Sequence, residues 1–335
     1  MTLGPRKTQA ALAVLLLFLI VLPLVVRARF FQHTLIMVVF YALLGEAWNI
    51  ITGYAGLISI GQAAFFGVGA YVSTFAFVKW GLNPWLGTLL SGLVTMVFGV
   101  AVGLPVTRLK GRYFAIATIA LSQTMKVVFE NWQYVGAARG IVHPIRDEGL
   151  LNFQFHTTKL PYYYIILAML VLTLIGMYLM EKSKLGYYFK AIRENEDVAS
   201  GLGVNKTYYK LVAIGLSAFI TGICGSFLAQ YSLYVEPAYV FNHTISVTIA
   251  LIAVFGGVGH LAGPLLGSAL LVPLSEYSRA LLGSGGRGID LMLYGAFIVL
   301  ICIFEPDGVV GLFRRRRLAP ATAGGRKEWW LWKSL

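Results

Sequence analysis

The sequence predicts an all-α polytopic integral membrane protein with about ten transmembrane helices and a short cytoplasmic amphipathic helix. Of its 335 residues, 58% are hydrophobic and 12% are charged. This is more apolar surface than a water-soluble domain of this length can bury. The 37 glycines are scattered through the apolar runs, and the alternating pattern of β-barrel strands is absent. These observations favour a single helical membrane domain.

Ten apolar segments approach the length of about 20 residues that a helix needs to cross a bilayer. The first follows Arg6 and Lys7, as in a signal peptide, but it exceeds the usual apolar region of about 7 to 15 residues. It also has no small-x-small cleavage site, so we expect a retained helix. The segment 244–258 carries the weakest signal. The ten are 9–26, 31–50, 57–78, 85–104, 113–130, 162–180, 211–231, 244–258, 263–282 and 289–304.

The distribution of lysine and arginine predicts the orientation. With both termini cytoplasmic, eighteen of these residues fall on the cytoplasmic side, eight fall on the opposite side, and Lys126 stays inside a span. Cytoplasmic loops carry an excess of positive residues, so we expect both termini in the cytoplasm. The net charge of +13 then reflects topology, and nucleic acid is not expected as a partner.

We expect one transmembrane domain at residues 1–313 and a basic cytoplasmic tail at 314–335. The four arginines at 314–317 would lie where anionic lipid headgroups meet the chain. Between the spans 162–180 and 211–231, the loop at about 186–206 differs from its surroundings. It belongs to the stretch GYYFKAIRENEDVASGLGVNKTYYK, residues 186–210.

This loop has the pattern of a short helix that is too polar to span a membrane. Asn195 is the one polar residue on its apolar face, and the other face carries three acids and two bases. A helix lying on the inner leaflet is one explanation, but such helices are rich in Lys and Arg. The mixed charge favours docking on a protein partner. The apolar face consists of Tyr187, Tyr188, Ala191, Ile192, Val198, Ala199 and Leu202.

Asp197, Val198 and Ala199, followed by Gly203, have the spacing of the EAA loop, E-A-A-x-x-x-G, of permeases in ATP-binding-cassette importers. The longer string KAIRENEDVASGLGVNKTYYKLVAIGLSAFITGICGS resembles the larger, M-type permease of the high-affinity branched-chain amino acid importers. Asp197 and Val198 are mild departures from the motif. Four further stretches share the resemblance, which covers nearly the whole chain after about residue 40: WNIITGYAGLISIGQAAFFGVGAY, GRYFAIATIAL, VFGGVGHLAGPLLGSAL and FEPDGVVGLF.

The resemblance implies a transport subunit that is not itself an enzyme. Its expected partners are ABC ATPase subunits, a second permease subunit that is different and smaller, an extracytoplasmic substrate-binding protein and membrane lipids. Branched-chain or other small apolar amino acids are the expected substrates, and urea or short amides are the alternative, because the loop 135–145 lacks the Thr/Gly/Ser-rich sequence of the family. The implied ATPase-coupling residues are Arg193, Glu194, Glu196, Asp197, Ala199 and Gly203.

The stretch 48–71 is apolar but interrupted by glycines and by Asn49, Ser59 and Gln62. Irregular backbone is tolerated at membrane depth only inside protein or beside a water-filled cavity. We therefore expect a broken helix beside the translocation pathway, with these three polar residues near the route. Close helix packing through small residues is the alternative. Close helix packing explains the G-x-x-x-G steps at 99–103 and 259–267, and the second series could also form the contact with a second permease subunit.

The sequence predicts no catalytic residues, no cofactor and no metal site. The G-x-x-x-x-G-K-[ST] motif is missing, so ATP would bind to another chain, and the five histidines lack metal-ligand spacing. Glu46, Lys126, Glu130 and Glu276 are ionisable groups inside spans, and Lys126 can pair with Glu130 at i+4. They do not form the chain of buried acids of a proton-driven carrier. Such a carrier, working without an ATPase, is the competing hypothesis.

Overall fold

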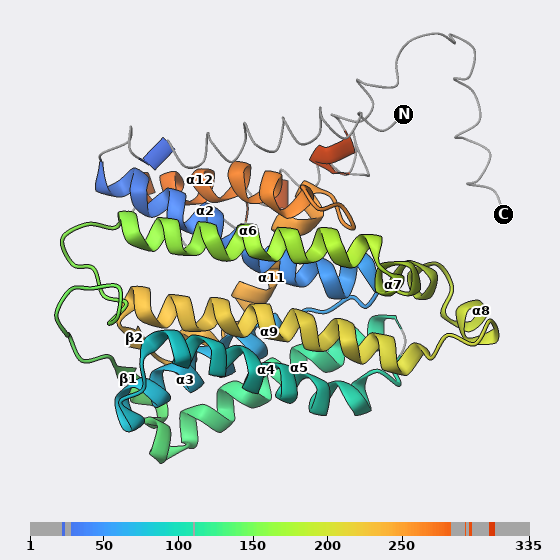
Figure 1. Ribbon diagram of the computed structural model, residues 1–335, viewed down its shortest axis with the longest axis horizontal. Helices are drawn as coiled ribbons and strands as arrows, with labels where there is room; N and C mark the ends of the chain where they lie inside the picture. The colour runs from blue at the N-terminus through green and yellow to red at the C-terminus, as the bar shows by residue number, and fades with distance from the viewer. Residues whose placement is uncertain are drawn as a thin grey trace, which may run out of the picture.

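The computed structural model describes residues 22–23, 28–109, 111–282, 292, 295–296 and 308–311. In this part of the chain, long helices run side by side along one direction, and two short strands pair at one end of the bundle (Figure 1). The elements are α2 (Arg29–Trp48), a π-helical turn (Asn49–Tyr54), α3 (Gln62–Trp80), α4 (Pro84–Val106), α5 (Arg112–Asn131), 3₁₀ turns (Gln133–Val135 and Ala137–Arg139), β1 (Ile141–Val142), α6 (Leu160–Lys182), α7 (Lys184–Glu194), α8 (Glu196–Gly201), α9 (Lys206–Ser232), β2 (Tyr234–Val235), α10 (Pro237–Val240), α11 (His243–Gly256) and α12 (Gly263–Leu282).

Six helical segments among the described residues are long and apolar enough to cross a membrane. The predicted spans 113–130 and 263–282 form the 20-residue helices α5 and α12, which do not belong to this set. The predicted spans 9–26 and 289–304 lie almost wholly outside the described residues, as does the tail 314–335. The chain is a polytopic helical membrane protein. The six are Arg29–Tyr54, Gln62–Trp80, Pro84–Val106, Leu160–Lys182, Lys206–Ser232 and Pro237–Gly256.

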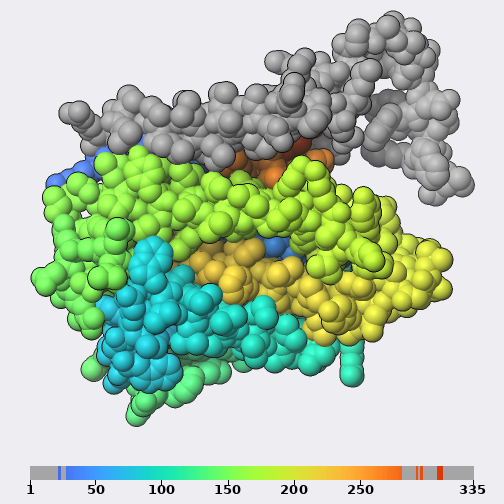
Figure 2. Space-filling model, in the orientation of Figure 1, coloured from blue at the N-terminus to red at the C-terminus, as the bar shows by residue number. Residues whose placement is uncertain are grey.

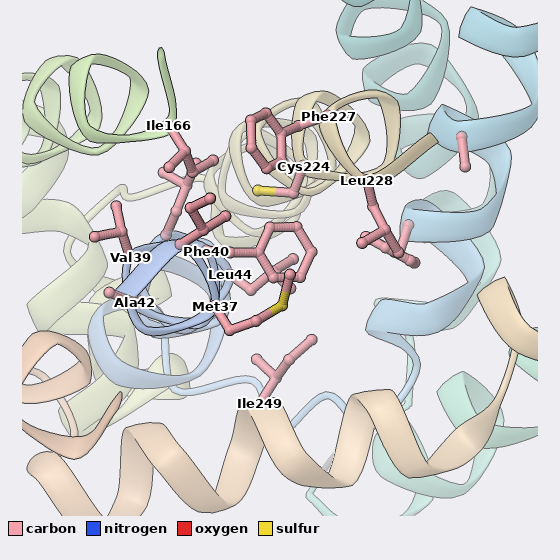
Figure 3. Packing of buried hydrophobic residues seen from close by; sticks show 14 of the residues in the cluster. Met37, Val39, Phe40, Ala42, Leu44, Ile166, Cys224, Phe227, Leu228 and Ile249 are labelled. Carbon is pink, nitrogen blue, oxygen red and sulfur yellow. The ribbon is translucent and has the colours of Figure 1, made fainter. Parts of the chain in front are cut away.

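Helix α2 forms the centre of the bundle and contacts α6, α9, α11 and α12. Phe40 and Leu44 of α2 face Phe227 of α9, while Ile249 of α11 covers the other side (Figure 3). Cys224 lies in the same cluster as a buried free thiol and packs there as a small apolar residue. Burial on all sides explains why α2 lacks an amphipathic pattern.

Small residues let α3, α4 and α9 approach closely. Gly69 of α3 lies against the backbone of Gly222 on α9, and Gly99 of α4 lies against Ala218 on α9. Gly263 and Gly267 of α12 pack in the same way on the end of α11. These glycines serve packing within the chain, so contact with a second subunit is not needed to explain the 259–267 series.

The two ends of the bundle differ in structure (Figure 1). At one end, Ile141 of β1 pairs with Val235 of β2, and the loop between α5 and α6 folds over the helices. His143 in this loop is buried and bonds to Thr74, with 2.8 Å between Nε2 and Oγ1. Burial lowers the pKa of His143 to about 4, so the imidazole is neutral at pH 7. The opposite end carries α7 and α8.

Candidate functional site

The segment 184–201, predicted as part of one amphipathic helix, forms two helices that meet at Asn195. The backbone of Asn195 is extended, with φ −158° and ψ 107°, so the single-helix prediction is wrong. Its side-chain oxygen accepts hydrogen bonds from the backbone N–H groups of Asp197 (3.0 Å) and Val198 (3.1 Å). Asparagine is a favoured N-cap because its side chain satisfies these otherwise free donors. The polar interruption of the apolar face is therefore the start of α8.

The residues of the predicted apolar face also point in different directions, some into the protein and some to the outside. Ile192 of α7 and Ala199 of α8 are buried, but Tyr187, Val198 and Leu202 are exposed by 68%, 59% and 81%. Because the chain bends at Asn195, one continuous buried face cannot form. Figure 2 shows that, among the described residues, α8 and the turn after it are the outermost part of this end. Two apolar side chains, Val198 and Leu202, thus project from the bundle.

The acidic residues of α8 are paired with lysines of α9. The carboxylate of Glu196 accepts a hydrogen bond from Lys210, which is only 5% exposed. Asp197 pairs with Lys206 at 3.1 Å, but its carboxylate is largely exposed. These two ion pairs fix α8 against the beginning of α9. Glu194, at the end of α7, is exposed.

Gly203 ends α8 in a left-handed conformation, with φ +87°. The N–H of Val204 bonds to the carbonyl of Ala199 at 3.1 Å, and the N–H of Gly203 bonds to Ser200 at 3.0 Å. This is a Schellman motif, in which glycine is preferred. No atom of the described residues lies within 4 Å of the place where a Cβ would be, so backbone conformation, and not packing against these residues, requires glycine here.

Arg193 of α7 is partly exposed, but its guanidinium reaches two neighbouring turns of the chain. Its Nη1 donates a hydrogen bond to the carbonyl of Gly53 in the π-helical turn. The backbone of Gly56 packs directly on Arg193, because a Cβ at Gly56 would lie 3.0 Å from the Arg193 Cα atom. Gly259, in the turn between α11 and α12, packs against the guanidinium. Arg193 therefore joins α7 to two other parts of the chain.

The backbone between the π-helical turn and α3 is not helical, as the sequence predicted for this stretch. The gap is residues 55–61, which is a few residues later than the predicted boundary between spans. The indole of Trp48 donates to the carbonyl of Ser59 at 2.7 Å, and Thr52 Oγ1 donates to the carbonyl of Leu57 at 2.8 Å. The irregular segment is thus folded back against the end of α2.

Side chains from two other helices accept hydrogen bonds from the backbone of this irregular segment and of the beginning of α3. Thr118 of α5 accepts from the N–H of Ile60 at 3.1 Å. Ser246 of α11 accepts from the N–H of Ala63 at 2.8 Å. These bonds satisfy backbone donors that have no helical partner. They hold an irregular backbone inside the protein.

Asn49, Ser59 and Gln62 are all fully buried. Gln62 donates to Ser217 at 3.0 Å and accepts from Thr221 at 3.2 Å, both on α9. Its amide therefore links the start of α3 to the middle of α9.

Asn49 bonds to the turn between α11 and α12. It accepts from the N–H of Gly259 at 2.8 Å and donates to the carbonyl of His260 at 3.1 Å. Asn49 and Arg193 thus contact the same turn, at Gly259. Ser59 and Gln62 lie at the other end of the irregular segment.

The sequence did not single out Gly56, Thr118 or Ser246 as functional residues, and it marked Gly259 only for helix packing or contact with a second permease subunit. Isolated hydroxyl groups in apolar spans were the available signal for Thr118 and Ser246. The glycines could not be distinguished from the many that pack helices. Lys126 and Glu130 pair at 3.7 Å as predicted, and the described residues contain no cluster of three or more metal-ligating side chains.

A bundle of apolar helices, with a buried break and a short two-helix segment protruding from one end, defines a polytopic membrane protein of the permease class. The family described as "Branched-chain amino acid transport system / permease component" matches residues 30–302. The chain belongs to this family, and the resemblance found in the sequence is confirmed.

The chain is similar to the LivM permease protein of the high-affinity branched-chain amino acid transport system of Salmonella typhimurium. The two are 29% identical over 302 residues, which cover 83% of this chain and 69% of that protein. Identity to LivM of Escherichia coli K12 is 28%, covering 82% and 68%. LivH of Escherichia coli K12, a second permease protein of a system of the same name, is 24% identical, covering 81% and 91%. No solved structure gives a significant match.

Proposed function

We propose that this chain is the membrane-spanning permease subunit of an ATP-driven importer for branched-chain or other small apolar amino acids. Membership of the permease family supports the transport role, and the substrate in the names of the LivM and LivH relatives supports the amino acid class. One observation carries the link to ATP. A two-helix segment protrudes from the bundle and returns an arginine to the buried break between α2 and α3.

The surface for the ATPase would be the protruding end of α8. Val198 and Leu202 are exposed and apolar, and Glu194 lies nearby at the end of α7. A helix that carries two such side chains four residues apart fits an apolar groove on a protein. Glu196 and Asp197 would act by holding α8 on α9 through Lys210 and Lys206. Ala199 and Gly203 would set the shape of the turn that follows.

Arg193 would carry movement of α7 into the membrane domain. It touches the end of the π-helical turn and the turn between α11 and α12, so a displacement of α7 reaches both without a flexible intermediate. The irregular segment 55–61 adjoins this contact and can change shape without breaking a long helix. Closure of the ATPase subunits would therefore first displace the irregular segment between α2 and α3.

This coupling role is tested with the transporter assembled from this chain and its co-expressed subunits in proteoliposomes. Arg193→Ala should lower the amount of amino acid transported per ATP hydrolysed by roughly 2- to 30-fold, equivalent to about 0.5–2 kcal/mol of coupling free energy. Lys184→Ala, on the exposed start of α7, is the control and should transport normally. An unchanged transport-to-hydrolysis ratio for Arg193→Ala would contradict the role given to this residue.

Asn49, Ser59 and Gln62 are proposed to control the route from within the break, by fixing the shape of its wall. Gln62→Leu removes two hydrogen bonds to α9, and each lost bond to a buried partner costs about 1–3 kcal/mol. Uptake should fall while the ATPase still co-purifies. Normal uptake by well-expressed Gln62→Leu protein would leave these residues with a packing role alone.

We propose that the chain crosses a bacterial-type cytoplasmic membrane ten times. Both termini and the α7–α8 segment would then lie in the cytoplasm. The lysine and arginine distribution supports it. A cysteine at the exposed position Ser200 should react with a membrane-impermeant thiol reagent only after the cells are opened. Reaction in intact cells would reverse this orientation.

The proposed partners are ABC ATPase subunits, a second and different permease subunit, an extracytoplasmic substrate-binding protein and the surrounding lipids. The existence of both LivM and LivH relatives in Escherichia coli supports a pair of related permeases. A carrier that works alone would purify without ATPase chains, whereas we expect co-purification. Uptake assays with leucine, urea and acetamide separate the amino acid proposal from the alternative of urea or short amides.

A further inference from the structure

Helix α5 is loosely packed, and most of its surface is uncovered. Only Phe114, Thr118, Ser122 and Phe129 are buried, and these four lie roughly along one stripe that faces the rest of the chain. The other side carries Gln123 and Thr124, which are both exposed. Lys126 and Glu130 are half-buried at its margin.

The polar residues of this outer face lie at the middle of the helix. With a rise of 1.5 Å per residue, Gln123 is roughly 16 Å from the first residue of α5 and roughly 12 Å from the last. A hydrocarbon core of about 30 Å places this amide near its centre. Buried polar groups without partners cost several kcal/mol in lipid. Contact between the outer face of α5 and lipid is therefore unfavourable.

Two other helices show what a lipid-facing surface looks like in this chain. The exposed residues in the middle of α4 include Leu93 and Val97, and those of α6 include Leu172 and Ile175. Between their ends, the exposed positions of α4 and α6 carry no charge or amide group, and the hydroxyl of Tyr178 lies in the last third of α6, away from its middle. The outer face of α5 differs from both by its polar centre. Apolar residues lie on either side of that centre, at Tyr113, Ile116 and Val127.

We propose that the outer face of α5 is the surface on which the second permease subunit packs, with Gln123 and Thr124 facing that subunit at the centre of the membrane. This inference rests on the proposed function. The apolar flanks would form the dry part of the contact, and the polar centre would find partners on the other subunit. Such a face suits a chain of the same fold that brings its own polar groups, and LivM and LivH are two related permeases of this kind.

The position of α5 connects this surface to the buried break. Thr118, on the inner side of the same helix, accepts a hydrogen bond from the backbone of Ile60 in the irregular segment. Ile58 of that segment is 51% exposed. One helix thus separates the break from the proposed interface. Movement at the break would reach the contact between the two permeases directly through α5.

The test places a photo-crosslinking amino acid, p-benzoylphenylalanine, at Gln123 in the transporter assembled with its co-expressed subunits. Irradiation should give a product that contains this chain and the different, co-expressed permease, identified by mass spectrometry. The same group at Leu93 on α4 is the control and should not give this product. Transport and ATPase co-purification are measured on each variant before irradiation, so failure of the proposed function is detected separately.

Three results would overturn the inference. The first is no permease product from Gln123 in a transport-active complex. The second is an equal product from Leu93, because that face should meet lipid. The third is a product made of two copies of this chain, which would exclude the different partner. A Gln123→Asn variant should retain the second permease on purification, whereas Gln123→Leu should retain less of it.

Discussion

The helical backbone is interrupted at residues 55–61 and at Asn195, and the two interruptions lie against each other through Arg193. They are stabilised in different ways. Around 55–61, the partners come from α2, α5, α9 and α11, through Trp48, Thr118, Ser217 and Ser246. At Asn195, the partner is the residue's own side chain, which caps α8.

An interruption of the helical backbone therefore depends on distant parts of the fold when it is buried, and on local groups alone when it is exposed. A buried break needs side chains from distant helices, because no water is available for its free N–H and C=O groups. An exposed break needs only a local cap and solvent. Substitutions at the buried break should therefore disturb the whole bundle, and substitutions at the exposed one should disturb only the contact with a partner.

Gly56→Leu should have the largest effect. Its added Cβ would lie 3.0 Å from the Arg193 Cα atom, and its φ is +74°. Overpacking costs about 1–3 kcal/mol, and the left-handed conformation costs roughly 1–2 kcal/mol more. We expect a lower unfolding temperature in detergent and loss of transport. Gly201→Leu, where a Cβ would meet nothing, is the control and should unfold as the unchanged protein does. Equal unfolding temperatures of the two variants would contradict the claim that the buried interruption is more sensitive to substitution than the exposed one.

Lys210→Met should have an intermediate effect, since it leaves Glu196 without its buried partner at the start of α9. Loss of one partner of a fully buried pair costs about 3–5 kcal/mol, and the partial exposure of Glu196 reduces this value. We expect less ATPase to co-purify and a modest decrease in unfolding temperature. The matched variant Lys206→Met breaks the exposed pair with Asp197 and should change stability by at most about 1 kcal/mol. The reverse order would mean that the pair with Asp197 fixes α8.

Gly203→Leu should have the smallest effect on the bundle. Space around the residue is open and only its φ of +87° is unfavourable for leucine, which costs roughly 1–2 kcal/mol locally. Membrane insertion should be normal, but ATPase binding or coupling of hydrolysis to transport should be lost because the turn changes shape. Gly203→Asn, which tolerates the left-handed conformation, should be milder. If Gly203→Leu keeps both ATPase binding and substrate-stimulated hydrolysis, the docking role of this end fails.

The helices themselves and the irregular stretch after Trp48 were predictable because each depends on local composition. Long apolar runs must form backbone hydrogen bonds internally, so they are helical, and glycines mixed with polar residues weaken a helix. The start of α8 was also readable, since Asn195 is a good cap. It was instead interpreted as a polar interruption of one helix, because periodicity alone does not report a bend.

The sequence by itself determined the membrane class, the positions of most helices and the family, because hydrophobicity and motifs are local properties of the chain. Only the tertiary structure decided that Arg193 contacts Gly53 and Gly259, that Glu196 and Asp197 bond to α9, and that α5 has a polar outer face. These features depend on which distant segments come together. The partners of Arg193, Gly53 and Gly259, are 140 and 66 residues away along the chain, and no spacing rule relates positions so far apart.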